Sequence, residues 1–392
     1  MEHIYLDNAA TTPVKQEVLD AMIPYFTQNF GNPSSVYKIA QINKKAVDES
    51  RETIEKALGA QTNEIFFTSG GTEADNWAIK GIAQAYKSKG NHIITTKVEH
   101  HAVLHTCEFL EKNGYEVTYL DVNEDGLVNP EDVEKAIKDT TILITIMYAN
   151  NEVGTIMPIK EIGEIAKKHN VFFHTDAVQA VGQIKIDVKA ENIDLLSLSG
   201  HKINGPKGIG ILYVRRGIKL ENLIHGGAQE RGRRAGTENV AGIVGLAKAM
   251  ELAYTNFDAK IERITRLRDK LIDGLLTSIP YSKLNGHRTK RLPNNVNIGS
   301  EFVEGESLLL LLDMNGIAAS SGSACTSGSL DPSHVLLALG LPHEKAHGSV
   351  RFSLGEMTTE EQIDFVLEKM PQIVERMRQM SPLYEDFIKN NI

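Results

Sequence analysis

Between residues 64 and 214, short apolar runs alternate with longer stretches of mixed apolar and polar residues. The apolar runs predict strands over residues 64–68, 92–96, 117–120, 142–147, 171–174, 193–198 and 209–214. The mixed stretches predict helices over residues 73–88, 102–112, 130–138 and 159–168. Because predicted strands and helices alternate, we expect an α/β fold whose mostly parallel sheet is flanked by helices.

The two ends of the chain do not continue this rhythm. Residues 1–35 read as an irregular arm with a short edge strand and a helix from Pro13, and a helix over 40–58 stops at Gly59. A helical stretch over 240–278 predicts a link to a second unit. That unit has expected strands at 294–298 and 350–353 and expected helices at 305–314 and 359–380. We therefore expect a large domain over 14–258 and a smaller α+β domain from 1–13 and 259–392.

Bulk properties narrow the function classes. The 392 residues carry a net charge of −9 and no long basic run, which argues against direct nucleic-acid or membrane-surface binding. No signal-peptide pattern and no apolar window of about 18 residues is found, so no membrane span is expected. Cys107 and Cys325 are the two cysteines, which suits a reducing cytoplasm better than a disulfide framework.

Lys202 lies in a glycine-rich turn between the predicted strands at 193–198 and 209–214. A partly desolvated lysine near other cations, here His201 and Lys207, loses its proton more easily and becomes a nucleophile toward carbonyls. We therefore predict that Lys202 forms a Schiff base with an aldehyde cofactor. From this stretch alone, a solvated surface turn is the simpler alternative.

Two further groups follow the first predicted strands. Gly71 and Thr72 begin a helix directly after a strand, where free backbone amides and the helix dipole favour an anion. His100 follows the next strand and could stack on an aromatic cofactor and move protons. A metal pair at His101 and His105 is the alternative, but no acidic or thiol ligand stands at a matching spacing.

Later strands add an acid and polar groups. Asp176 follows an apolar strand, and a buried carboxylate must be paired, as it would be by a protonated pyridine nitrogen. Asn151 could bond a ring substituent or shape a turn. The Thr237 hydroxyl and the guanidinium groups of Arg233 and Arg234 are possible phosphate contacts. An anion cradle, a stacking ring, a buried acid and a reactive lysine are together what pyridoxal 5′-phosphate needs.

The motifs around these residues resemble those of cysteine desulfurases of the NifS/IscS type, in the class V aminotransferase-like, fold-type I group of pyridoxal-phosphate enzymes. The resemblance covers nearly the whole chain. Its motifs are Leu6-Asp7-Asn8-Ala9-Ala10-Thr11-Thr12, Gly31-Asn32-Pro33-Ser34-Ser35, Thr68-Ser69-Gly70-Gly71-Thr72-Glu73, Glu99-His100, Asn150-Asn151-Glu152-Val153-Gly154, Asp176-Ala177-Val178-Gln179, Ser199-Gly200-His201-Lys202, Gly236-Thr237-Glu238-Asn239, Ser320-Ser321-Gly322-Ser323-Ala324-Cys325 and Arg351-Phe352-Ser353-Leu354-Gly355.

The resemblance implies a role for each matching residue. Lys202 would be the Schiff-base lysine, with Asp176 on the pyridine nitrogen. The remaining cofactor contacts would be Gln179 on the ring oxygen, His100 on the ring face, Asn151 beside it, and Gly71, Thr72, Ser199 and His201 on the phosphate. Thr237 would reach the phosphate of the other subunit of a homodimer. Arg351 would bind the substrate α-carboxylate by a bidentate bond, with Asn151 and Asn32 assisting.

Cys325 stands in a run of small residues that could carry a thiol from the active site to an acceptor. The resemblance implies that Cys325 takes sulfur from L-cysteine as a persulfide, leaves L-alanine, and passes the sulfur on, for iron–sulfur cluster assembly. It could also be a transient iron–sulfur ligand shared with a scaffold protein. An incidental loop cysteine is the alternative, and Cys107 is expected to be an inert core residue.

Several alternatives stay open at this point. An aminotransferase or a selenocysteine lyase could use the same scaffold, and a non-catalytic protein could keep the fold. The acceptor could be an iron–sulfur scaffold of NifU or IscU type or a tRNA-thiolation relay. Thr237-Glu238-Asn239 resembles the NifS-like branch more than the IscS-like one.

Overall fold

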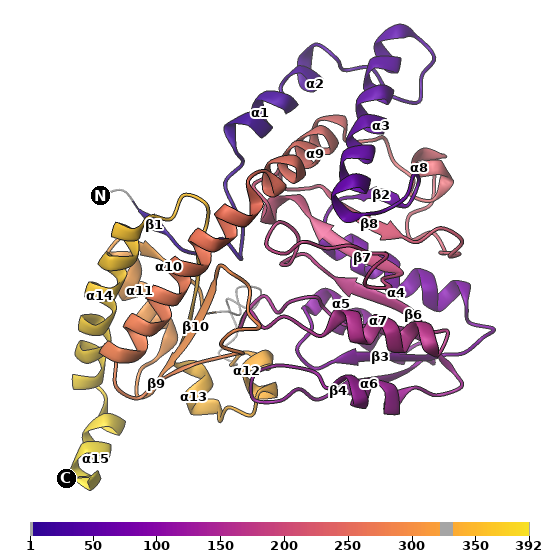
Figure 1. The fold of residues 1–392 in the computed structure, drawn as a ribbon. Coiled ribbons are helices and arrows are strands. Elements are labelled where there is room, and N and C mark those ends of the chain that lie inside the picture. Colours follow the sequence, from indigo (N-terminus) through magenta and orange to yellow (C-terminus); the bar gives the residue numbers. More distant parts are fainter. Residues whose placement is uncertain (1–2, 322–331, 392) are drawn as a thin grey trace.

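The computed structural model describes residues 3–321 and 332–391 (Figure 1). Its described part contains a seven-stranded sheet in the order β2-β8-β7-β6-β5-β3-β4. The strands are β2 Ile65–Thr68, β3 His92–Thr96, β4 Glu116–Leu120, β5 Thr141–Thr145, β6 Phe172–Asp176, β7 Leu195–Ser199 and β8 Gly210–Val214. Among them β8 alone runs antiparallel to its neighbours. The predicted α/β class with a mostly parallel sheet is therefore confirmed.

Helices cover both faces of this sheet (Figure 1). Alternate strand residues point to opposite faces, so Leu195 packs in one apolar cluster and Leu196 in the other. The helices on the Leu195 side are α4 Gly71–Ala85 and α5 His101–Glu111; on the other side are α3 Lys38–Leu58, α7 Ile159–Lys168 and α9 Val240–Tyr254. The remaining helices of this region are α1 Gln16–Met22, α2 Pro24–Thr27, α6 Pro130–Ala136 and α8 Gln229–Gly232.

Local sequence signals explain several helix ends. Gly59 ends α3 in the left-handed conformation with φ of 68°, as its sequence position predicted. Asn129 caps α6 by accepting a hydrogen bond from the Glu131 amide, and Pro130 occupies the first helical position. The helical stretch expected over 240–278 is instead two helices. It breaks before α10 Phe257–Ser278 because Asn256 adopts φ of 48°.

A third apolar cluster lies in the C-terminal third of the chain. It forms around a three-stranded antiparallel sheet, β12-β10-β9, and a two-stranded sheet, β1-β11, within the described residues. Its strands are β1 Ile4–Tyr5, β9 Ser282–Leu284, β10 Asn295–Ser300, β11 Ile317–Ala318 and β12 Ser349–Ser353. Its helices are α10, α11 Gly305–Met314, α14 Glu360–Gln379 and α15 Pro382–Asn391. The domain bounds at residues 13/14 and 258/259 stay a prediction.

The two regions are joined at several places. α9 and α10 run from one to the other (Figure 1), and the short helices α12 His334–Ala338 and α13 His343–His347 contribute Leu336 and Ala346 to the core of the large sheet. The N-terminal arm also connects them, because Leu6 packs in the C-terminal cluster while Thr12 bonds the His201 carbonyl. None of the helices described is both long and apolar enough to cross a bilayer.

Candidate active site

A cavity of about 400 Å³ lies at the carboxyl ends of the large-sheet strands. Ten of the residues predicted from the sequence line it. They are Gly71, Thr72, His100, Asn151, Asp176, Gln179, Ser199, His201, Lys202 and Arg351. In an open α/β sheet, ligands bind at this end of the strands. Sequence motifs that are spread over 280 positions, from 71 to 351, therefore line one cavity.

Lys202 reaches the cavity from the turn that joins β7 to β8. The single 3₁₀ turn Gly200–Lys202 follows Ser199 directly. The chain then reverses, and β8, which begins at Gly210, runs antiparallel to β7. A Cβ atom at Gly210 would lie 2.8 Å from the Gly70 backbone, so this approach of the two loops requires glycine. The turn is thereby held against the start of α4, the predicted anion site.

The N-terminal arm holds the amine of Lys202. Its Nζ donates hydrogen bonds to the carbonyls of Ala9 at 2.6 Å and Ala10 at 2.8 Å. Gln179 Nε2 donates to the same Ala9 carbonyl at 2.9 Å. Two carbonyl oxygens stabilise a protonated amine, so the arm holds the Lys202 amine in its protonated form. Sequence reasoning had not assigned this role to Ala9 and Ala10, although both lie in a quoted motif.

The start of α4 is built to receive an anion. A Cβ atom at Gly71 would lie 2.7 Å from Val178 Cγ2, which leaves room there for glycine but not for a larger residue. Ser199 and His201 lie on the same cavity. Arg234, which the sequence allowed as a phosphate contact, instead pairs with Glu73 at 2.8 and 3.0 Å. The start of α4 thus offers helix amides and the hydroxyls of Thr72 and Ser199 to an anion, while Arg234 is paired with Glu73.

His100 and His201 are both neutral near pH 7. Burial, and then the charge of Lys202, lower the pKa of each imidazole to about 4. His100 Nδ1 accepts a hydrogen bond from the Ala102 amide at 3.1 Å, so its ring proton sits on Nε2. A neutral ring is suited to stacking on an aromatic ligand, and the Nε2–H of His100 can donate a hydrogen bond.

Asp176 ends β6 and is 6% exposed. Its Oδ1 accepts the Val178 amide at 2.9 Å. Burial raises the pKa of its carboxyl to about 6, while the Val178 bond and the charge of Lys202 act in the opposite direction. A buried acid that forms no salt bridge with another described residue fits a cationic ligand atom such as a protonated ring nitrogen.

Arg351 enters the cavity from β12 of the small sheet and is 2% exposed. It donates to Asp7 Oδ1 at 2.8 Å and to the Asn151 carbonyl at 2.9 Å. Arg351 is thus oriented by the N-terminal arm on one side and by the loop after β5 on the other. A planar guanidinium in this position can bind a carboxylate. The pairing with Asp7 was not foreseen from the sequence.

Two predicted residues do not line the cavity of the single chain, and a third is not among the described residues. Asn32 is exposed, and its Oδ1 accepts the Ser34 amide. Thr237 is exposed in the segment before α9. Cys325, including its possible role as an iron–sulfur ligand, lies outside the described residues. The other cysteine, Cys107, is buried in the core as expected, and burial raises the pKa of its thiol.

The metal alternative at His101 and His105 gains no third ligand. The two rings stack with centroids 4.9 Å apart, and His334 lies 4.8 Å from His101. Over residues 3–321 and 332–391, however, these nitrogens do not gather with other ligand atoms closely enough to bind one ion. The imidazoles form a packed cluster beside the cavity.

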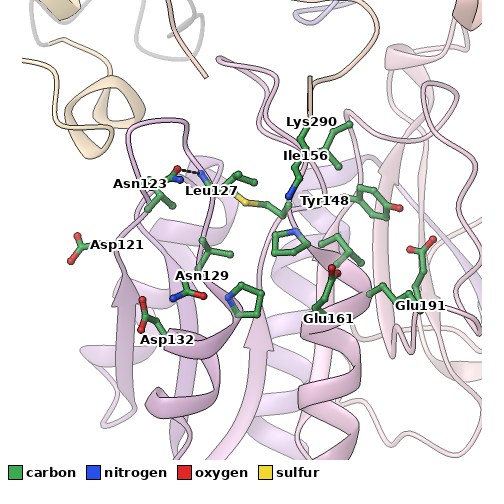
Figure 2. Close-up of a pocket in the computed structure, with 17 residues that line it drawn as sticks. Asp121, Asn123, Leu127, Asn129, Asp132, Tyr148, Ile156, Glu161, Glu191 and Lys290 are labelled. Carbon is green, nitrogen blue, oxygen red and sulfur yellow. Dashed lines mark hydrogen bonds between the residues drawn. The ribbon is translucent and has the colours of Figure 1, made fainter. Parts of the chain in front are cut away.

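A larger cavity, of about 860 Å³, lies between the loops after β4 and β5 (Figure 2). Figure 2 shows Asp121, Asn123 and Asn129 on one side of it and Tyr148 and Glu191 on the other. None of the residues predicted from the sequence lines it. The chemistry is therefore concentrated in the smaller cavity.

Asp75 and Glu99 are buried acids near the smaller cavity that sequence reasoning missed. Each is 1% exposed. Asp75 lines the cavity, and its position in α4 carried a signal, since it stands on an otherwise apolar helix side with Ala78, Ile79 and Ile82. Glu99 precedes His100 and had been quoted only as part of a motif.

The model of the aminotransferase class-V family matches residues 4–366 of the chain. A relative at 62% identity is the cysteine desulfurase IscS of Clostridium botulinum (strain Hall), with 99% of this chain and 98% of that protein aligned.

Solved structures of similar proteins have the same fold. A NifS-like protein superposes with a TM-score of 0.90 at 39% identity, covering 95% of this chain and 99% of the other. A structure of SspA in complex with cysteine gives a TM-score of 0.81 at 40% identity, covering 91% and 100%. Both NifS-like and IscS names thus occur among the relatives.

Proposed function

Since the chain belongs to the class-V aminotransferase family, we propose that it is a cysteine desulfurase that converts L-cysteine to L-alanine and hands on the sulfur. The observation that carries this proposal is the convergence of Lys202, Asp176, His100 and Arg351 on one cavity. The relatives named cysteine desulfurase, and the neighbour solved with cysteine, support the choice of substrate.

The cavity fits pyridoxal 5′-phosphate. Gly71 lines the cavity at the start of α4, the helix amides there and Ser199 offer donors to a phosphate, and Asp176 is a buried acid suited to a protonated ring nitrogen. Lys202 would hold the aldehyde, His100 the ring face and Gln179 the ring oxygen. When bound, this cofactor supplies an electron sink for negative charge at the substrate Cα.

The protein's own groups then bind the substrate and move its protons. Arg351 binds the α-carboxylate of cysteine, helped by Asn151, and so orients the Cα–H bond. Lys202, once free, takes the Cα proton and returns one to the product, and the Ala9 and Ala10 carbonyls steady its protonated state. His100 Nδ1 accepts the Ala102 backbone hydrogen bond, so its Nε2 carries the ring proton and would donate a hydrogen bond to the substrate sulfur.

The Cys325 thiolate would receive the sulfur. It attacks the substrate Sγ and forms an S–S bond, while the C–S bond breaks and its electron pair stays with the carbon skeleton, which becomes alanine after protonation. The thiolate is the nucleophile, so we expect the rate to rise with pH through the Cys325 pKa. Persulfide transfer to an iron–sulfur scaffold protein or another sulfur acceptor would follow, in the cytoplasm, where free thiols persist.

Exposed apolar side chains support a homodimer. Five apolar side chains in the segment formed by α1, α2 and the start of α3 are between 46% and 92% exposed: Ile23, Phe26, Phe30, Val36 and Tyr37. This segment lies at one end of the molecule (Figure 1). Apolar patches of this kind mark protein interfaces. In a dimer, the exposed Thr237 could reach a partner's phosphate site, and a sedimentation mass near twice 43.3 kDa would agree.

The substitution Cys325→Ala tests the function directly. We expect the variant to keep the cofactor's visible absorption, because Lys202 and the other proposed cofactor contacts are unchanged, and to lose sulfur transfer to an acceptor. Alanine formation from L-cysteine and persulfide labelling are the measurements. Cys107→Ala is the matched control and should retain both activities.

The outcomes separate the alternatives. Unchanged turnover in Cys325→Ala would remove this thiol from the reaction. Exchange of the amino group with a keto acid would identify an aminotransferase, and turnover of selenocysteine with rejection of cysteine would identify a selenocysteine lyase. A colourless protein that does not take up pyridoxal phosphate would contradict the proposal as a whole.

A further inference from the structure

Asp75 is a buried acid of the cavity that the proposed reaction does not use. It lies on α4, one turn after Gly71, and is 1% exposed. Its Oδ1 has no hydrogen-bond partner among the described residues. A buried polar atom without a partner destabilises a fold, so its retention at a cavity wall points to a ligand-directed role.

A second acid lies next to it. One carboxylate oxygen each of Asp75 and Asp176 and a ring nitrogen of His100 lie within 4.8 Å of one another. Both acids are buried. Two carboxylates at this separation in a low-dielectric site cannot both be ionised near neutral pH without a cation beside them.

Lys202 supplies a positive charge on the Asp176 side of the pair, but the groups packed around Asp75 supply none. On β6, His174 Nε2 lies 3.7 Å from Asp75 Oδ1, but burial lowers the pKa of His174 to about 3. The imidazole is therefore neutral, and its nitrogens contact the hydroxyls of Thr145 at 2.8 Å and Ser197 at 3.0 Å. Glu99, the further acid nearby, makes ionisation of Asp75 still less favourable.

Asp176 has support for a negative charge that Asp75 lacks. It accepts the Val178 amide, and the charge of Lys202 stabilises its ionised form. Asp75 has the hydroxyl of Ser197 nearby, while burial and the charge of Asp176 raise the pKa of its carboxyl well above the ordinary value. Of the two acids, Asp75 is therefore the one that retains a proton.

We propose that Asp75 and Asp176 form a carboxyl pair that holds one proton, carried by Asp75, so that Asp176 presents a single negative charge to the cationic ring nitrogen of the cofactor. This inference rests on the proposed function for the identity of that cofactor. Asp75 acts through Asp176 and is a positioning residue.

Cofactor affinity tests the pair without measuring turnover. Pyridoxal phosphate is titrated into the cofactor-free full-length protein at pH 7, with the unsubstituted chain, Asp75→Asn and Asp176→Asn compared. Asparagine keeps the shape of the side chain and cannot ionise. We expect Asp75→Asn to bind within about threefold of the unsubstituted chain, and Asp176→Asn to lose more than about tenfold, as when a buried charge pair loses one partner.

A loss in Asp75→Asn as large as that in Asp176→Asn would overturn the proposal, because it would show that Asp75 is ionised and contributes its own charge. At higher pH the unsubstituted chain and Asp75→Asn should diverge as Asp75 ionises. If the unsubstituted chain and Asp75→Asn have identical pH profiles up to pH 10, both in cofactor affinity and in carboxyl titration, Asp75 does not carry the proposed proton.

A second measurement does not depend on cofactor binding. With aspartate labelled at the carboxyl carbon, the Asp75 NMR signal is identified by its loss in Asp75→Asn, or, if that variant does not fold, by its shift in Asp176→Asn. We expect Asp75 to titrate at a higher pH than Asp176 and its pKa to fall in Asp176→Asn. Titration of Asp75 at or below the pH at which Asp176 titrates in the unsubstituted protein would overturn the pair. If no chain bound pyridoxal phosphate, the proposed function would fail and this titration alone would decide.

Discussion

The two walls of the active-site cavity are built on different principles. The large-sheet wall takes its groups from strand ends and from the turns that follow them, as with Asp176 after β6 and Lys202 after β7. The small-sheet wall takes Arg351 from within β12, a strand whose five residues are all buried and which pairs with β10. The N-terminal arm contacts both walls, through the Ala9 carbonyl to Lys202 and through Asp7 to Arg351.

This difference has a functional meaning. The large-sheet wall carries every residue proposed to hold the cofactor within one chain, while the small-sheet wall carries the proposed carboxylate binder. Cofactor retention and substrate recognition should therefore be separable by substitution. The arm is where the two properties are expected to be coupled, since its carbonyls and carboxylate touch both lysine and arginine.

Lys202→Ala is expected to have the largest effect, because it removes the reactive group of the large-sheet wall. We predict loss of the internal cofactor linkage and a fall in alanine formation of about 10²–10⁴-fold. Absorption spectra and borohydride trapping measure the linkage. Lys207→Ala, an exposed lysine of the same turn, is the control. A borohydride adduct in Lys202→Ala like that of the unsubstituted chain would refute the assignment.

Arg351→Lys should have the next largest effect. It should weaken substrate binding at the small-sheet wall and leave cofactor binding at the large-sheet wall unchanged. Lysine keeps the charge but cannot make the bidentate bond, so KM for cysteine should rise, by about 10–100-fold, with the cofactor spectrum unchanged. Steady-state kinetics and absorption measure the two properties. Arg288→Lys, at the surface of the same region, should match the unsubstituted chain. Loss of cofactor in Arg351→Lys would mean that the walls are not separable.

Glu99→Gln is expected to have the smallest effect and to appear mainly in pH dependence. Burial raises the pKa of Glu99 to about 8, although Thr96 and the Met147 amide bond its carboxylate. A raised folded-state pKa contributes stability at low pH that is lost as pH rises through about 8. The substitution should therefore flatten the decline in thermal stability between pH 6 and 9, by on the order of 1 kcal/mol or more.

Glu116→Gln provides the control for that measurement. Its carboxylate is exposed beside Lys138, which lowers its pKa, so its contribution is lost on acidification and is constant between pH 6 and 9. Thermal unfolding monitored by circular dichroism over this range compares the variants. An unchanged slope in Glu99→Gln would show that this acid is already ionised in the folded protein.

Much of the large sheet could be predicted because its signals are local. The bounds of β3, α7 and α11 coincide with those expected, since apolar runs and helix periodicity mark them. The short helices α8, α12 and α13 carry too little periodic pattern to stand out, and α15 was not predicted. The break at Asn256 was missed because neither glycine nor proline marks it, although asparagine tolerates the left-handed conformation.

The candidate site divides in the same way. Lys202, His100 and Asp176 were found because polar groups after apolar strands are conspicuous, and the structure brings them to one cavity. Arg351 came from family resemblance alone, since an arginine inside a strand has no local signal. Asp75 was missed because its meaning depends on Asp176, 101 positions away, and the pairing of Asp7 with Arg351 depends on a contact across 344 positions.

The parallel pairing of Ile4 with Ile317, and the bond from the Ala9 amide to Ser353, have a consequence for biosynthesis. Residues 4–9 leave the ribosome long before residues 317 and 353, with which they pair. A growing chain can assemble the seven-stranded sheet before these partners are made, but the peptide groups that steady Lys202 settle only after residue 353 has emerged. Competence to handle a reactive amino acid is thereby postponed until that residue is in place.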